Sequence, residues 1–131
     1  MRLLLDTHVL LWWLADDRKL SNAGRDIIAN PGNELLVSSA SVWEISIKAA
    51  LKRIQIQLDD LEDAIIGNGF RSLPIGFRHA IAAGRLPLLH RDPFDRMLVA
   101  QASVEELRIV SHDRVFEKYS FRDEGLRPIF V

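Results

Sequence analysis

The chain has 131 residues, of which 48% are hydrophobic and 27% charged, as is typical of one soluble globular domain with a sizeable core. Its net charge of −1 argues against a protein that holds nucleic acid by bulk positive charge alone. It contains no cysteine, which excludes disulfides and thiolate metal sites and permits a reducing compartment without showing one. We expect a cytoplasmic protein. The apolar run at residues 9–15 is too short to cross a bilayer, so no membrane partner is expected.

Apolar runs bounded by polar and turn residues predict the elements of the first part of the chain. They are a strand at Arg2–Leu5, helices at Val9–Ala15 and Ser21–Asn30, a strand at Glu34–Ser38 and a helix at Ser39–Arg53. The first strand ends abruptly in Asp6, and open α/β sheets bind their ligands at the carboxyl ends of strands. Asp6 is therefore a candidate site residue, although Asp6 or Thr7 could also simply start the next helix.

Glu44 lies in a comparable place, shortly after the second predicted strand. Ser41 and Glu44 are spaced as a capping box, in which the glutamate would accept a hydrogen bond from the N–H of the capping serine. Glu44 and Lys48 are four residues apart and are expected to pair on the helix surface. Either role explains Glu44 without a part in catalysis or metal binding. Its position after a strand nevertheless makes it a candidate site residue.

The rest of the chain continues the alternation of helices and strands. The expected elements are a helix at Asp59–Gly69, a strand at Phe70–Ile75, a helix at Gly76–Ala83 ended by Gly84, a helix from the Asp92 cap through Ala102, a strand at Leu107–Val110, a short helix through Tyr119 and a strand within Leu126–Val131 with Pro128 at its edge. The acids that open the helix at Asp59–Gly69 are expected to be solvated, because no strand delivers them to a sheet edge. The alternation predicts an α/β fold with a mainly parallel sheet flanked by helices.

The helix that begins near residue 92 gathers two acids at its N-terminus. Asp92 suits the N-cap, and Pro93 suits the first helical position, where no N–H is needed. Asp95 falls in the first turn, where the helix dipole stabilises a negative charge by about 0.3–1 kcal/mol. Taken alone, this stretch is explained by a well-capped helix.

Four acids are placed where they can converge. Asp6, Glu44 and Asp113 each follow a predicted strand, and Asp95 opens a helix. In a parallel sheet the strand ends share one edge, so these carboxylates can meet there. Two like charges 4 Å apart repel by about 4 kcal/mol at an effective dielectric constant near 20, so the cluster requires protonation or a cation. Oxygen ligands without cysteine favour Mg²⁺ or Mn²⁺, and such ions promote phosphodiester hydrolysis.

Residues 68–91 contain no acid but several basic side chains, namely Arg71, Arg78, Arg85 and Arg91 with two histidines. This local excess can follow the phosphate backbone of a nucleic acid. It can equally be an ordinary charged surface, and the sequence does not decide between the two.

Four segments in this order are similar to those of a known family. They are LLLDTHVLLWWL at residues 3–14, SSASVWEISIKAALKRI at 38–54, HRDPFDRMLVAQA at 90–102 and IVSHD at 109–113. The chain resembles the PIN-domain ribonucleases, and more closely the VapC-type toxins of bacterial and archaeal toxin–antitoxin modules, along essentially its whole length. An acid after a strand is common, but four acids in this order and in these contexts are a more specific signal.

The resemblance implies a single PIN-like domain over residues 1–131 that cleaves RNA endonucleolytically with Mg²⁺ or Mn²⁺. The acidic positions of the family fall on Asp6, Glu44, Asp95 and Asp113. The three aspartates would hold the metal, and Glu44 would complete the ligand shell or orient the attacking water. The small hydroxyl residues of the family fall on Thr7 and Ser111, which would hydrogen-bond to carboxylates or to the scissile phosphate, and Asp92 is left to the cap and a supporting role.

The resemblance also implies two protein partners, a small antitoxin that blocks the site and a second copy of the chain in a homodimer. Apolar residues support association. Five large apolar residues follow one another in one short helix, at positions 10–14, and successive residues point all round a helix. At least one tryptophan among Trp12, Trp13 and Trp43 is therefore expected at the surface or covered by another chain.

Two other classes of protein stay open. A phosphohydrolase of the haloacid dehalogenase type also begins with an apolar strand that ends in aspartate, but it needs a second aspartate two residues later, where this chain has His8. A non-catalytic interaction module with an inert acidic pocket is the other alternative, which RNA cleavage with and without a chelator would test.

Overall fold

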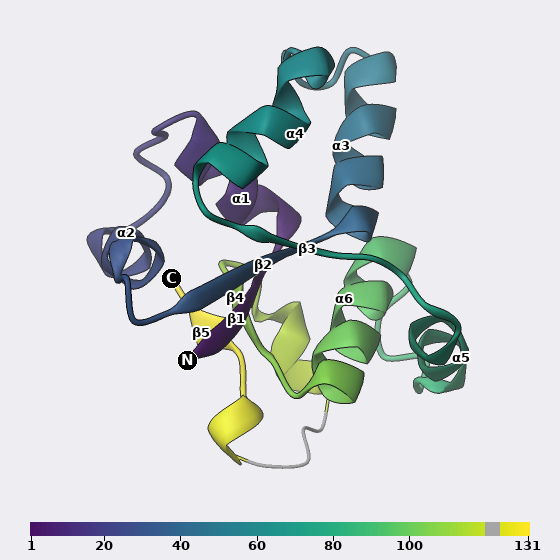
Figure 1. Cartoon of the computed structure of the whole chain (residues 1–131). Coiled ribbons are helices and arrows are strands. Elements are labelled where there is room, and N and C mark those ends of the chain that lie inside the picture. Colours follow the sequence, from purple (N-terminus) through teal and green to yellow (C-terminus); the bar gives the residue numbers. More distant parts are fainter. Residues whose placement is uncertain (120–123) are drawn as a thin grey trace.

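A computed structural model describes residues 1–119 and 124–131 (Figure 1). The strands are β1 (Arg2–Leu5), β2 (Glu34–Ser38), β3 (Arg71–Leu73), β4 (Arg108–Ser111) and β5 (Ile129–Phe130). The helices are α1 (Thr7–Leu14), α2 (Asn22–Ala29), α3 (Ser39–Ala50), α4 (Leu58–Gly67), α5 (Phe77–Arg85) and α6 (Pro93–Glu105), with short 3₁₀ turns at Arg114–Lys118 and Glu124–Leu126. In the part of the chain described, no helix is both long and apolar enough to cross a membrane.

The five strands form one sheet in the order β3-β2-β1-β4-β5, and each neighbouring pair is parallel. The chain moves outward from β1 to β2 and β3, then crosses back to place β4 on the other side of β1. The order therefore reverses between β1 and β4. In open parallel sheets this reversal leaves a crevice at the carboxyl ends of the two strands, where ligands bind.

The sheet is buried on both faces, as a parallel sheet with crossover helices requires. Leu3 and Leu5 of β1 pack on one face with residues of α1, α2 and α4, whereas Leu4 points to the other face, against Leu98 of α6. Figure 1 shows α1, α2 and α4 to one side of the sheet and α5 and α6 to the other. The predicted fold class, a parallel sheet flanked by helices, is confirmed.

Several helices begin or end at other residues than the hydrophobic pattern predicts. α1 begins at Thr7 because Asp6 caps it. α3 ends at Ala50, three residues early, and Lys52 just beyond takes the left-handed conformation with φ of 56°. α5 runs through Gly84 to Arg85, so the predicted glycine stop is wrong. The helix ends where Leu86 becomes extended, because a following proline disfavours the helical conformation.

The last predicted strand, at Leu126–Val131, is shorter in the structure. Strand pairing covers Ile129–Phe130, and Glu124–Leu126 forms a 3₁₀ turn. Pro128 directly precedes the paired residues and has no N–H for a sheet ladder, in keeping with its predicted place at the strand edge. The short β5 still extends the parallel sheet beside β4.

Candidate active site

Asp6 is the first residue after β1, and only 4% of its surface is exposed. Its carboxylate accepts a hydrogen bond from the N–H of Val9 at 2.8 Å, which caps α1, and another from the hydroxyl of Ser111. Burial raises the pKa of Asp6, the two hydrogen bonds oppose that rise, and the nearby charge of Asp113 adds to it. Asp6 therefore caps α1, and its ionised form is disfavoured by burial at the crevice between the ends of β1 and β4.

Ser111, the last residue of β4, joins two of the predicted acids. Its buried hydroxyl donates to the carboxylate of Asp6 and accepts from the N–H of Asp113 at 2.9 Å. The carboxylate of Asp113 accepts from the N–H of Val115 at 2.9 Å and so caps the 3₁₀ turn that follows. Unlike Asp6, Asp113 is exposed. The end of β4 is thus locked to the end of β1 across the point where the strand order reverses.

α6 brings two further acids to the same edge. Asp92 accepts hydrogen bonds from the N–H groups of Phe94, at 2.8 Å, and Asp95, at 3.1 Å, so its predicted role as the N-cap is confirmed. Asp95 points away from the helix, and one of its oxygens lies 2.9 Å from Nε2 of His90. Burial raises the pKa of Asp95 to about 6, the contact with His90 opposes the rise, and repulsion from Asp92 and Asp6 adds to it.

Arg96 fixes the segment that carries His90. Its guanidinium donates to the carbonyl oxygens of Ala83, Leu86 and Pro87, each at 3.0 Å, and more weakly to that of His90 at 3.4 Å. One side chain of α6 therefore satisfies the carbonyls at the end of α5 and along the connection between the helices. This connection places His90 against Asp95.

Glu44 reaches the site from α3. It is buried, and its carboxylate lies 3.0 Å from Nζ of Lys48, so the predicted pairing of these residues is confirmed. The predicted capping box is wrong. Ser38 caps α3, and the hydroxyl of Ser41 instead accepts a hydrogen bond from that of Thr7 at 3.0 Å. Thr7 thus ties α1 to α3 rather than contacting a carboxylate.

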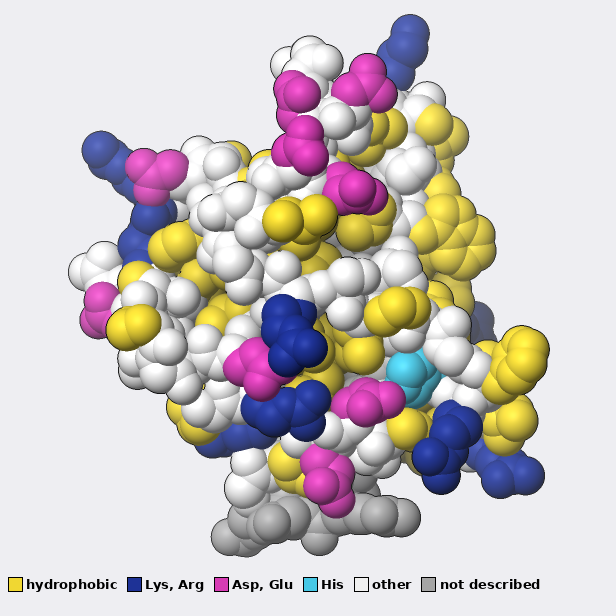
Figure 2. Space-filling view, viewed as in Figure 1, with side chains coloured by type: hydrophobic (Ala, Val, Ile, Leu, Met, Phe, Trp, Pro, Cys, Tyr) yellow, Lys and Arg dark blue, Asp and Glu magenta, His cyan; other side chains and the backbone are white. Residues whose placement is uncertain are grey.

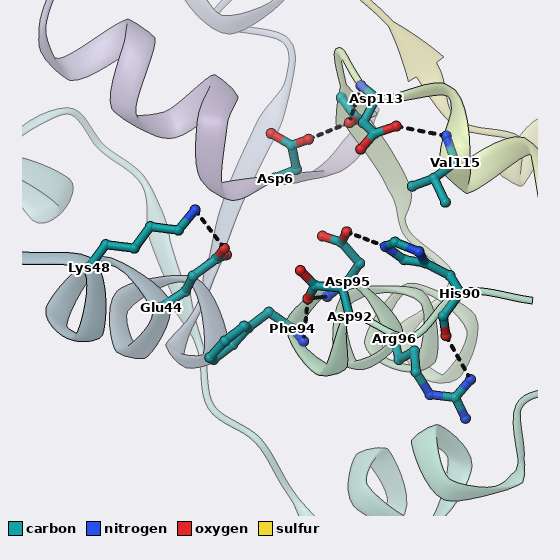
Figure 3. Close-up of polar contacts among 11 residues, drawn as sticks. Asp6, Glu44, Lys48, His90, Asp92, Phe94, Asp95, Arg96, Asp113 and Val115 are labelled. Atoms are coloured by element: carbon teal, nitrogen blue, oxygen red, sulfur yellow. Dashed lines mark hydrogen bonds and ion pairs between the residues drawn. The ribbon is translucent and has the colours of Figure 1, made fainter. Parts of the chain in front are cut away.

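Figure 3 shows the carboxylates of the site gathered around one space between α1, α3 and α6. Within the described ranges, one group of metal-ligating side chains has its ligand atoms within 4.8 Å of one another, namely His90, Asp92 and Asp95. Asp6, Glu44 and Asp113 stand outside that group but face the same space. Asp6 and Asp95 are at least partly buried, repel each other and have raised pKa values, and such carboxylates suit a hard divalent cation, so the residues fit Mg²⁺ or Mn²⁺.

The four arginines of the acid-free window lie in different places. Arg71 opens β3 and pairs with Glu34, which opens β2, at 2.7 Å, so it lies at the edge of the sheet opposite the acids. Arg78 and Arg85 are exposed on α5. Arg91 is exposed and lies in the chain directly between His90 and Asp92.

Sequence reasoning missed the contact of His90 with Asp95 and the contact between Trp43 and Phe94. The sequence pattern groups His90 with the basic residues of the window, and only its spacing of five residues from Asp95 hints at contact. Trp43 and Phe94, which directly precede Glu44 and Asp95, lie edge to face with ring centroids 5.4 Å apart. Trp43 remains 61% exposed, in agreement with the expectation that one tryptophan stays at the surface.

The fold and the site define an α/β protein with an acidic pocket at the carboxyl edge of a parallel sheet. The sequence profile of the PIN domain matches residues 3–122. Ribonuclease VapC22 of Mycobacterium tuberculosis (strain ATCC 25618 / H37Rv) is 34% identical over 113 residues, which cover 85% of this chain and 86% of that protein. The chain therefore belongs to the PIN-domain family, which sets aside the haloacid dehalogenase alternative.

Solved structures share the fold at low sequence identity. VapBC2 from Rickettsia felis, bound to a DNA fragment from its promoter, matches with a TM-score of 0.64 at 14% identity, over 90% of this chain and 92% of that one. A toxin–antitoxin complex from Klebsiella pneumoniae matches with a TM-score of 0.63 at 17% identity, over 98% of both chains. These likenesses confirm the PIN fold.

Proposed function

We propose that this protein is an Mg²⁺- or Mn²⁺-dependent endoribonuclease that a small antitoxin protein neutralises. The observation that carries the proposal is the pair of partly or fully buried aspartates, Asp6 and Asp95, whose pKa values are raised at the carboxyl edge of the sheet. Such a pair is electrostatically unfavourable without a cation. Membership of the PIN family, with a relative named as a ribonuclease, supports RNA as the substrate.

In this proposal Asp6, Asp95 and Asp113 hold the metal, with Glu44 completing the site and Asp92 supporting it. When bound, the cation neutralises charge on the scissile phosphodiester and lowers the pKa of water. Lys48 fixes the Glu44 carboxylate, which orients the attacking water and accepts its proton. The hydroxyl of Ser111 and the N–H of Val9 both donate to the carboxylate of Asp6 and fix its orientation. The buried carboxylate therefore needs no rearrangement during the reaction.

Phosphate contacts to the RNA are proposed for the arginines nearest the acids. Arg91 is exposed beside the His90–Asp92 segment, and Arg78 and Arg85 extend a basic surface along α5. Figure 2 shows basic side chains on this part of the molecule, around α5. Arg71 is the weakest candidate because Glu34 already pairs with it at the opposite edge of the sheet.

An apolar groove offers a surface for the antitoxin. It has a volume of about 510 Å³ between α1, the segment after α3 and α4, and its lining includes Leu11, Trp12, Ile54, Ile56 and Leu61. The apolar face of an amphipathic helix fits such a groove. The solved complexes with this fold support a protein partner of the antitoxin class. If the small protein encoded by an adjacent upstream reading frame neither binds nor stops cleavage, the antitoxin proposal fails for that protein.

A second copy of the chain is proposed to cover the exposed apolar residues of α5 and the segment after it. Phe77 is 91% exposed, and Ile81 and Leu88 are exposed as well. Figure 2 shows hydrophobic side chains at the surface around this helix. Sedimentation should give a dimer at tens of micromolar that Phe77→Ala weakens, and a wild-type monomer would remove the homodimer.

The ribonuclease proposal is tested with an end-labelled single-stranded RNA. The purified protein should produce internal fragments with Mn²⁺ and none with EDTA. If it binds RNA but produces no fragments with any divalent ion, the alternative of an inert acidic-pocket module is correct.

A further inference from the structure

Two aromatic side chains frame the acidic site without belonging to either hydrophobic cluster of the core. Trp43 of α3 and Phe94 of α6 meet at 5.4 Å between ring centroids with an interplanar angle of 76°. Each directly precedes an acid of the site, Glu44 or Asp95. Figure 3 shows the Phe94 ring extending from α6 toward α3, on the side of Glu44. The pair therefore bridges the two helices at the rim of the acidic space.

This arrangement leaves most of the indole open while fixing its orientation. Trp43 is 61% exposed, and Phe94 is partly buried, so the phenyl ring acts as the support and the indole as the free surface. The backbone of Phe94 is held in the first turn of α6, because its N–H donates to the capping carboxylate of Asp92 at 2.8 Å. An aromatic ring that is rigid, exposed and next to reacting groups suits a planar apolar ligand.

The charges nearby explain why such a contact is useful to a ribonuclease. The acids repel the phosphates of RNA, Lys48 is already paired with Glu44, and Arg96 is engaged with backbone carbonyls. The residues one helical turn from Trp43 on α3 are Ser39, Ala40, Ser46 and Ile47, none of which is charged. Apart from the proposed phosphate contact of Arg91, attraction at this rim therefore comes from an uncharged contact, and nucleobases supply a flat face that stacks on aromatic rings.

We propose that Trp43, supported by Phe94, stacks one unpaired nucleobase of the RNA next to the scissile phosphodiester. The proposal rests on the ribonuclease function proposed above and adds a substrate requirement to it. A base inside a duplex is already stacked on its neighbours and cannot reach the indole, so the enzyme selects single strands and loops. Stacking tolerates every base, so Trp43 selects unpaired RNA rather than a sequence.

The test is a double-mutant cycle between the indole and the base. The bond that wild type cleaves in a single-stranded RNA is first mapped, and each flanking nucleotide is then replaced in turn by an abasic ribonucleotide. At one position, loss of the base should lower kcat/KM of wild type by about fivefold to a hundredfold, as expected for one stacked base. Trp43→Ala should show the same loss on intact RNA and no further loss on that abasic RNA.

Matched variants separate stacking from general surface effects. Ile66→Ala, at 62% exposure on α4, should leave kcat/KM unchanged, and Trp43→Phe should restore part of the activity. If the losses from Trp43→Ala and from base removal multiply at every position, no base stacks on Trp43 and the inference is overturned. It is also overturned if Trp43→Ala turns a wild-type dimer into monomers and its loss is equal on all RNAs, since the residue is then a dimer contact.

A binding version of the cycle distinguishes this inference from the activity on which it rests. Dissociation constants are measured in EDTA with a six-nucleotide uridine RNA and its single-abasic versions. If Trp43 and one base are coupled in binding but no cleavage occurs in Mn²⁺, the stacking proposal is supported and the ribonuclease proposal is wrong. Cleavage in Mn²⁺ without coupling in either version keeps the ribonuclease and removes the stacking surface.

Discussion

Replacing Asp95 by asparagine should make the metal-free protein more stable at neutral pH. The ordinary pKa of this carboxyl is 3.8, and in the folded protein burial and the neighbouring acids raise it to about 6. Each unit corresponds to about 1.4 kcal/mol, so the ionised side chain destabilises the fold by up to about 3 kcal/mol above pH 6. Its side chain is 22% exposed, so solvent screening leaves most of this effect in place.

The pH dependence has a definite sign. Between about pH 4 and pH 6 the folded protein holds a proton on Asp95 that the unfolded chain has released, so wild-type stability falls as the pH rises through this range. Asp95→Asn removes this fall. The variant should be about 2–3 kcal/mol more stable than wild type at pH 7.5, and the two should be nearly equal at pH 4.

Urea unfolding in EDTA at both pH values measures the effect, and Mn²⁺ should then stabilise wild type more than the variant. Asp63→Asn, an exposed aspartate on α4, is the control and should change stability by less than about 0.5 kcal/mol at either pH. A variant that is less stable than wild type at pH 7.5, or a difference that does not depend on pH, would overturn this interpretation of the carboxyl. Asp95 would then serve the helix rather than a cation.

Three further predictions concern single substitutions. Ser111→Ala removes the hydroxyl that donates to the buried carboxylate of Asp6, and should lower the free energy of unfolding by about 1–3 kcal/mol at pH 7.5 in urea titrations; no change would mean that Asp6 is protonated or solvated. Glu44→Gln removes the charge partner of Lys48, whose side chain is 26% exposed, and should lower the free energy of unfolding by about 1–3 kcal/mol; the folded variant should lose most RNA cleavage, whereas unchanged turnover would remove Glu44 from the site. Arg91→Ala should reduce the salt dependence of RNA binding by about one unit of slope, and Arg71→Ala should not. If both variants keep the wild-type slope, Arg91 makes no phosphate contact and the acid-free window at residues 68–91 is ordinary surface.

The sequence predicted the central strands β1 and β2 because each is an apolar run that ends in polar residues. Strands at Arg2–Leu5 and Glu34–Ser38 were predicted at their observed bounds. Local chemistry also predicted the Asp92 cap, since an aspartate followed by proline suits the first turn of a helix. The alternation of helices and strands then predicted parallel pairing, which brings the strand ends to one edge without any knowledge of contacts.

The failures came from competition that local spacing does not reveal. Ser41 and Glu44 have capping-box spacing, but Ser38 at the end of β2 caps the helix first, and Thr7 from another helix uses the hydroxyl of Ser41. The contact between His90 and Asp95 depends on a connection that Arg96 holds by donating to backbone carbonyl oxygens. Every residue carries such an oxygen, so the sequence does not show which ones Arg96 will bind. Such contacts arise from tertiary packing and are visible only in the folded chain.

The rate of RNA cleavage as a function of Mn²⁺ concentration, for wild type and Asp6→Asn, decides whether the acids form a catalytic metal site. Wild type should be inactive in EDTA and reach a plateau with Mn²⁺. Asp6→Asn should stay folded by circular dichroism and cleave at least about tenfold more slowly at every concentration, because loss of a direct ligand should cost no less than loss of a residue that orients one. Full activity of wild type in EDTA, or a wild-type Mn²⁺ curve for Asp6→Asn, would show that the acids do not hold the cation required for cleavage.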